Sequence, residues 1–359
     1  MISNERIHKK RLYIDFHVIQ TVPPSCVNRD DTGSPKTAFY GGTIRARISS
    51  QAWKRSIREM FKSDIFENDK LGNRTKRVVD LVAKEIQKID SSFTLESAEK
   101  KAQEVLKDAG VSLKEKNTDA LFFMSELQAR SLAEISLENY DKNDAKKALK
   151  DNPSIDMALF GRMVASDPSL NYDAAAQVAH SISTHTVHNE FDYFTAVDDC
   201  APEDNAGAGH IGTTEFNSST LYRYATVNVA ELASNLGIET ATKAVCGFAK
   251  AFILSMPTGK QNSFANRTVP NMVYVTIRDD QPVNLIGAFE KPVFAADSGY
   301  IEKSEKSLAD YSNKVYDTFV HPPVKEFWIG DCPVDAVTSI SLQDMLNQLE
   351  QFILEKLSE

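Results

Sequence analysis

The residues of this chain best suited to chemistry are basic ones near its N-terminal end. The segment Thr32–Arg58 holds six lysines and arginines and no aspartate or glutamate. A solvated face normally mixes both signs, so a run without acids is typical of a surface that holds an anion. Just upstream, Arg29 precedes the carboxylates of Asp30 and Asp31. The chemistry on offer is electrostatic binding of phosphates, beside two carboxylates able to act as acid, base or metal ligand.

The charge of the whole chain is distributed unevenly. Net charge is −9, but residues 1–58 hold 11 Lys/Arg against 4 Asp/Glu, and residues 59–359 hold 30 against 46. A positive segment on an acidic body attracts a polyanion to one groove and discourages binding elsewhere. The distribution therefore favours one nucleic-acid groove.

Two elements must position the basic side chains. Arg45 and Arg47 alternate on a short extended run, so both should point to the same side. A helix should begin at Ser49, and residues three and four apart on it place Lys54, Arg55 and Arg58 on one exposed face. The free N–H groups at the start of that helix also favour a phosphate. Together these features predict a groove that holds several phosphates without reading bases.

The remaining elements follow from hydrophobic period and turn residues. We expect strands at Arg11–Val22, Ile155–Val164, Leu221–Val229 and Asn271–Ile277, helices over residues 62–155, Ala230–Leu254 and Leu342–Leu357, and a protruding hairpin or loop over 186–219. Without the two insertions, the order is strand, helix, strand, strand, helix, strand. That order is the ferredoxin-like arrangement of RNA-recognition domains, so we expect an α+β fold.

Other classes of function have weaker support. The four cysteines form no CxxC pair, which suits reduced thiols in a cytoplasm. No run of 18 apolar residues predicts a membrane span, and the N-terminus lacks the pattern of a signal peptide. His180, His185 and His188 have a spacing that raises the question of a metal site. Their neighbours are serine and threonine, so we expect packed or hydrogen-bonding histidines, no metal and no cofactor.

Six short segments carry a resemblance to a known family. In chain order they are Ser25–Asp31, Phe39–Gly42, Arg47–Arg55, Gly161–Met163, Asp192–Asp199 and His210–Gly212. The chain resembles the CasC family, the backbone subunit of the type I-E CRISPR Cascade complex. The resemblance spans roughly residues 11–290 and is only general in the fingers segment. It implies a hand-shaped protein with an RNA-recognition-like palm (1–61, 156–185 and 220–330), helical fingers (62–155), a β-hairpin thumb (186–219) and a C-terminal helix (331–359).

The resemblance also implies roles for particular residues. The phosphates of the guide RNA (crRNA) would be held by Arg29, Lys36, Ser49, Gln51, Lys54, Arg55 and Arg58, to which the charge pattern of the basic segment adds Arg45 and Arg47. One guide base would be turned out of the stack by the thumb residues Tyr193, Phe194 and Val197, with Met163 as a wedge. Fingers lysines would touch target DNA: Lys142, Lys146, Lys147 and Lys150. These lysines fit a plain solvated helix face equally well, because aspartates are interspersed. The implied partners are crRNA, target DNA, further copies of the chain in a head-to-tail filament and other Cascade subunits.

Three alternatives stay open at the level of sequence. The first is a non-catalytic scaffold, in which base pairing reads the sequence and protein holds the backbone. The second is a metal-dependent ribonuclease of the type III CRISPR backbone-subunit kind that uses Asp30 or Asp31. The third is an oligomeric shell protein without nucleic acid. The motif around Asp30 follows the type I-E pattern, so we expect an ion pair or turn capping there, no catalytic residue and no enzyme activity.

Overall fold

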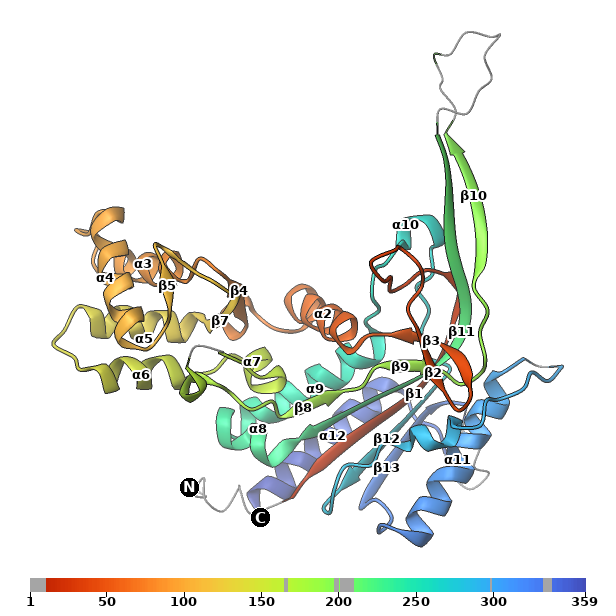
Figure 1. The fold of residues 1–359 in the computed structure, drawn as a ribbon. Helices are drawn as coiled ribbons and strands as arrows, with labels where there is room; N and C mark the ends of the chain where they lie inside the picture. Colours follow the sequence, from red (N-terminus) through yellow and green to blue (C-terminus); the bar gives the residue numbers. More distant parts are fainter. Residues whose placement is uncertain (1–10, 165–166, 197–199, 201–209, 298, 332–337) are drawn as a thin grey trace.

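The computed structural model describes residues 11–164, 167–196, 200, 210–297, 299–331 and 338–359 (Figure 1). These residues form a mixed α+β fold around an antiparallel sheet of nine strands, which confirms the predicted class. Seven of the strands lie in the order β13–β12–β1–β11–β9–β3–β2, and β8 and β10 also pair with β11. The strands are β1 (Tyr13–Ser25), β2 (Thr37–Tyr40), β3 (Thr43–Ile48), β8 (Ala176–Val178), β9 (Ser181–Ser183), β10 (Glu190–Ala196), β11 (His210–Asn228), β12 (Met272–Arg278) and β13 (Lys325–Gly330).

Helices cover both faces of this sheet, which we call the palm together with them. On β1, Ile14, Phe16 and Val18 belong to the core shared with α9 (Ile238–Leu254) and α12 (Leu342–Ser358). Alternate residues face the other side, where Ile19 packs with α11 (Ile301–Thr318). The predicted strand at Arg11–Val22 is confirmed, and because both its faces are covered, its polar residues are buried too.

The remaining palm helices are short or continue one another. They are α2 (Ser50–Met60), which runs into the π-helical turn η1 (Phe61–Ile65), α7 (Ile155–Phe160), α8 (Val229–Leu236), α10 (Gln261–Phe264), and the 3₁₀ turns η3 (Pro168–Leu170) and η4 (Leu285–Phe289). None of the helices in the described part of the chain is long and apolar enough to cross a membrane.

The predicted helical insertion is a separate layer with its own core, which we call the fingers. Four helices, α3 (Val78–Ile89), α4 (Leu95–Asp108), α5 (Glu126–Ser136) and α6 (Lys142–Lys150), bury one apolar face each. Short strands that the sequence analysis did not anticipate close the unit: β4 (Gly72–Thr75) with β7 (Phe122–Ser125), and β5 (Leu113–Lys114) with β6 (Asn117–Thr118). A 3₁₀ turn, η2 (Asn68–Lys70), precedes β4.

A long hairpin projects from the palm, as predicted for residues 186–219 (Figure 1). We call it the thumb; in the described residues it consists of β10 and the part of β11 that pairs with it, from His210 to Phe216. The same strand β11 continues into the sheet, where it pairs with β1 from Asn217 to Asn228. Thumb and palm therefore share one continuous strand.

One predicted element is wrong in type. The apolar segment Ile155–Val164 was expected to be a strand, but residues Ile155–Phe160 form helix α7. Every residue of the helix is buried, so the sequence shows no polar face from which to read a period. The helix ends because Gly161 adopts a φ of 76°, and a Cβ at this glycine would lie 2.8 Å from the Tyr172 carbonyl oxygen.

Candidate nucleic-acid interface

The loop between β1 and β2 is shaped by the carboxylate of Asp30. Its Oδ1 accepts hydrogen bonds from the Thr32 backbone N–H at 3.0 Å, the Thr32 hydroxyl at 2.7 Å and the Ser34 N–H at 3.0 Å. The Thr32 hydroxyl contributes most to holding the pKa of Asp30 below its ordinary value. The expected turn-capping role of Asp30 is confirmed. Asp31 and Arg29 on the same loop are exposed.

Arg45 does not face any groove, which corrects the expectation that it contacts RNA. Its side chain is buried, and its guanidinium donates to the backbone oxygens of Ser183 at 2.9 Å and Phe289 at 2.9 Å. The residue lies on the same side of β3 as Arg47, as alternation predicts, but the segment after η4 covers that side at Arg45. An arginine whose donors are used by carbonyl groups inside the protein has none left for a phosphate.

Arg47 lies outside the segment that buries Arg45, and its side chain is half-exposed. Its Nε donates to the Thr37 carbonyl oxygen at 3.0 Å, and its Nη1 lies 3.2 Å from His180 Nδ1. Lys36, the residue before β2, lies opposite Arg47, and its carbonyl oxygen accepts the Arg47 N–H at 2.9 Å. Two cations thus stand side by side at the mouth of the β1–β2 loop.

Helix α2 begins next to these cations, as its serine cap predicts. Ser49 is the N-cap and its hydroxyl accepts from the Ala52 N–H, so this hydroxyl is engaged within the helix. Trp53 and Ile57 bury the inner face, and no acid lies in the first turn. Gln51 and Arg55 are exposed and Lys54 is half-buried. The outer face therefore presents positive charge beside the positive end of the helix dipole.

Arg58 differs from its neighbours on α2 and corrects a second expectation. Its side chain is 16% exposed, and its Nε donates to Asp156 Oδ2 at 2.8 Å. Asp156 is buried at the start of α7 and also accepts from the Gly72 N–H and the Ser154 hydroxyl. Arg58 is thus mainly a structural partner that joins α2 to α7. Of the predicted trio, Lys54 and Arg55 remain on the outer face, where Arg55 pairs with the exposed Glu59 at 2.8 Å.

Sequence reasoning missed a cation from the fingers that completes this surface. Arg74 on β4 is exposed and lines a pocket of about 520 Å³ together with residues of α2. Its guanidinium lies over the ring of Phe123 at 4.7 Å. Burial, and then the charge of Arg74, lower the pKa of Lys54, so the two cations face one space. The run Arg74–Arg77 carries three basic residues, and this was the signal that could have revealed it.

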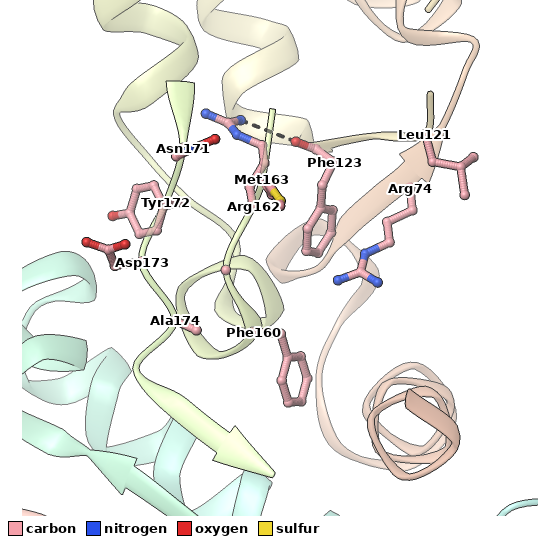
Figure 2. A pocket seen from close by; sticks show the side chains of 11 residues that line it. Arg74, Leu121, Phe123, Phe160, Arg162, Met163, Asn171, Tyr172, Asp173 and Ala174 are labelled. Carbon is pink, nitrogen blue, oxygen red and sulfur yellow. Dashed lines mark hydrogen bonds between the residues drawn. The ribbon is translucent and has the colours of Figure 1, made fainter. Parts of the chain in front are cut away.

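The pocket beside Arg74 continues toward Met163. A second pocket of about 550 Å³ shares Arg74 and Leu121 with the first and is lined by Phe123, Phe160 and Met163. Figure 2 shows the ring of Phe123 between Met163 and Arg74, with the ring of Phe160 farther along the lining. Met163 is 80% exposed. The surface thus passes from cations on α2 to apolar side chains at the base of the fingers.

Met163 owes its position to the buried arginine before it. Arg162 donates to the carbonyl oxygens of Leu170, Phe123 and Leu149 at distances of 2.9 to 3.2 Å. It also reaches Gln128 Oε1 at 3.3 Å. These partners come from η3, β7, α6 and α5. Arg162 therefore fixes the junction from which Met163 projects (Figure 2).

The thumb carries the expected aromatic residues. Tyr193 is 75% and Phe194 45% exposed, and Phe191, which the sequence analysis did not single out, is 61% exposed. Phe194 lies over Gly212, where a Cβ would meet its ring at 2.3 Å. Val197 lies outside the described residues. The thumb and helix α7, which ends three residues before Met163, stand well apart within one chain (Figure 1), so a strand could meet both the thumb and Met163 only if it passed along the molecule or between copies.

The remaining candidates fall away from this surface. The fingers lysines Lys142, Lys146, Lys147 and Lys150 are all exposed on α6, where Lys142 and Lys146 approach Asp108 and Asp167 at 3.8 and 3.6 Å. His185 is buried: its ring stacks on Tyr300 and its Nε2 accepts from the Thr220 N–H at 3.0 Å. This confirms the expected packed and hydrogen-bonded histidine.

Comparison with known proteins gives one family and many chains of solved structures, of which two are described below. The family described as CT1975-like protein matches residues 14–353. One chain of a CRISPR RNA-guided surveillance complex, described as pre-nicking, is 30% identical with a TM-score of 0.80, and the match covers 95% of this chain and 100% of that one. A chain of another CRISPR RNA-guided surveillance complex is 27% identical with a TM-score of 0.60, covering 96% and 99%. No curated protein sequence matches this chain.

Proposed function

This chain belongs to the CT1975-like protein family, and we propose that it is the guide-RNA-binding backbone subunit of a type I-E CRISPR Cascade complex. Its similarity over almost the whole length to chains of CRISPR RNA-guided surveillance complexes supports the coarser role. The motifs Arg47–Arg55 and Asp192–Asp199 support the finer type.

The observation that carries the proposal is a group of basic side chains on an acidic protein. We define the basic groove as Lys36, Arg47, Gln51, Lys54, Arg55 and Arg74. Lys36 directly precedes β2, and the other members come from β3, α2 and β4. Gln51, Lys54, Arg55 and Arg74 line one pocket, and Lys36 and Arg47 line another. Phosphate contacts of this kind fix the register of a strand and carry no base information, so the bases of the guide stay free to pair with DNA.

Head-to-tail copies along the guide would use two apolar features, one at the base of the fingers and one on the thumb. Met163 projects at the base of the fingers and the exposed rings of Tyr193 and Phe194 lie on the thumb. Apolar side chains of this size separate stacked bases at modest energetic cost. We propose that the thumb of one copy and Met163 of the next interrupt the guide at regular intervals, and that the exposed lysines of α6 attract the target strand.

Charge reversal on the groove tests RNA binding. We expect Lys54→Glu with Arg55→Glu to abolish copurification of guide RNA from cells that express the guide. Arg55 pairs with Glu59 at the surface, and neither side chain holds a buried carboxylate among the described residues. The matched control is Lys100→Glu with Lys306→Glu, which makes the same change in net charge at exposed sites on α4 and α11. Equal loss in both variants, or retention in both, would contradict the groove. Arg58 is left intact, because its loss would strand the buried carboxylate of Asp156.

We also propose that the chain does not cut the strand it holds. The support is the carboxylate of Asp30, whose Oδ1 accepts three hydrogen bonds from its own loop. Incubation of the RNA complex with Mg²⁺ or Mn²⁺ should leave the guide intact. Regular fragments that appear with metal and disappear in Asp30→Ala or Asp31→Ala would establish the ribonuclease instead.

A further inference from the structure

Within the basic groove, one guanidinium is held in place by a side chain that nothing so far assigns to RNA binding. We propose that His180 is a positioning residue: its neutral imidazole accepts a hydrogen bond from Arg47 and keeps that guanidinium aimed at a single phosphate of the bound strand. This inference rests on the proposed function, and it concerns how the site is built.

Two acceptors fix the plane of the Arg47 guanidinium. Nε donates to the Thr37 carbonyl oxygen at 3.0 Å and Nη1 to His180 Nδ1 at 3.2 Å. Arginine is always a donor, so Nδ1 must be unprotonated and the ring proton must lie on Nε2. In the described part of the chain, Nη2 has no hydrogen-bond partner. A planar group held at two corners with a free third corner is preorganised for an anion.

The cations here have no carboxylate to neutralise them. Lys36 and Arg47 face each other just beyond the β2–β3 ladder, where the Lys36 carbonyl oxygen accepts the Arg47 N–H at 2.9 Å. Neither side chain forms an ion pair with any residue that the structure describes. Like charges in that position destabilise a strand pair, and a bound phosphate would remove the penalty. The groove keeps this arrangement although the rest of the chain is rich in acids.

The charged groups that face His180 are Arg47 on β3 and Lys36 before β2. Burial first, and then these two charges, lower the pKa of His180, so the ring is neutral at physiological pH. A carboxylate in its place would orient Arg47 equally well but would cancel its charge. A neutral imidazole orients the guanidinium and leaves the full charge for the phosphate.

Chain connectivity places the imidazole beside the start of α2. His180 directly precedes β9, and β9 pairs with Arg47 and Ile48 of β3. Ile48 is followed by the helix cap Ser49. The Arg47 guanidinium, its histidine and the positive end of α2 therefore adjoin, which is the arrangement that one phosphate would span.

The test measures binding of a synthetic oligouridine strand to the purified full chain over a series of salt concentrations. Arg47→Ala should weaken binding about tenfold, the value of one charge-assisted hydrogen-bonded contact. It should also reduce the salt slope by about 1. His180→Ala should lose at least about threefold and reduce the slope as well, although it removes no fixed charge. In the Arg47→Ala background, His180→Ala should have no further effect.

His180→Asn is the conservative rescue, because its amide oxygen can take the place of Nδ1; it should bind like the wild type. His321→Ala, an exposed histidine after α11, is the matched control and should change nothing. If the wild type binds RNA and His180→Ala binds it with the same affinity, the positioning role is overturned. Additive losses of affinity in the double variant would overturn it as well. Failure of His180→Asn to restore binding would also overturn it. A wild-type chain that binds no RNA would instead refute the proposed function itself.

Discussion

Arg45 and Arg47 stand two residues apart on β3, and their guanidinium groups have opposite surroundings. Arg45 donates to carbonyl groups inside the protein, whereas Arg47 is half-exposed near the edge of the sheet. Arg223 repeats the buried pattern: it lies over the ring of Trp53 at 3.8 Å and donates to the Phe252 carbonyl near the end of α9. A cation at that end of a helix complements its dipole. A basic residue of this protein is therefore a candidate for RNA binding only where no other segment of the chain buries its side chain.

His17 is the residue that should govern how stability responds to acid. Its ring is buried among Tyr222, Tyr224 and Tyr274, and Nδ1 lies 2.8 Å from the Tyr222 hydroxyl. Burial, and to a lesser extent the charge of Arg278, lower the pKa of His17 to about 3. Between this value and the ordinary pKa of about 6.5, the unfolded chain binds a proton that the folded chain does not. Stability from His17 is thus full above pH 6.5 and falls as the pH drops toward 3.

Replacement of His17 should remove that dependence. From pH 7 to pH 5, the wild type should lose about 2 kcal/mol of unfolding free energy more than His17→Gln does. Burial raises the pKa of Asp15 to about 6, which has the opposite sign, but this carboxyl is present in both proteins and cancels. Urea titrations at the two pH values measure the difference, with His17→Phe as a second variant. Parallel pH curves for wild type and variants would rule out the assignment.

The sequence predicts the roles of these residues only where no distant segment of the chain buries them. The acid-free run Thr32–Arg58 located the groove, and the serine cap located the start of α2. Alternation placed Arg45 and Arg47 on one side but could not show that a segment 240 residues later covers only Arg45. The pairing of Arg58 with Asp156 spans 98 residues and was equally hidden.

At the scale of elements, Arg162 is the side chain that joins fingers to palm. We expect Arg162→Met, which keeps most of the volume but none of the donors, to lower the free energy of unfolding by about 3 kcal/mol, because three carbonyls and an amide lose their partner. Hydrogen exchange should quicken in β7 and α6 and stay unchanged in β1 and β12. Arg130→Met removes an exposed arginine of α5 paired only with Glu134 and serves as the control. Equal protection of α6 in both variants would count against this role.

The type of an element was predictable where one of its faces is polar. Each fingers helix has one apolar face and one charged face, so the spacing of its apolar residues predicts a helix correctly. Helix α7 has no exposed face, and its six apolar or buried residues fit a strand as well as a helix. The short strands β4 to β7 are two to four residues long, too short to show a period.

For the whole molecule, the basic groove predicts where RNA should protect the backbone. We expect hydrogen exchange to slow on guide binding in residues 36–58, in β4 and in the thumb. The helices α11 and α12 should be unaffected, because they lie on the faces of the sheet and carry no part of the groove. Comparison of the chain with and without guide provides the measurement. Protection spread evenly over the acidic body would refute a single groove.

The order of palm, fingers and thumb along the chain was readable from the sequence, because each segment has its own composition. The sheet was only partly readable. Its central pair, β1 with β11, joins residues about 200 apart, and no local pattern encodes such a pairing. The surface that would contact the thumb cannot be predicted from one sequence either, because it would belong to another copy of the chain.

The strand shared by thumb and palm has a mechanical consequence. β11 is 19 residues long, and its inner part is hydrogen-bonded along both edges, to β1 on one side and to β8 and β9 on the other. A strand held in this way behaves as a cantilever. The projecting hairpin can bend along its length, but it can pivot at the palm only if hydrogen bonds of the ladder break. A force applied to the thumb is therefore carried into the centre of the sheet. The angle at which the thumb leaves the palm is set there, before any partner arrives.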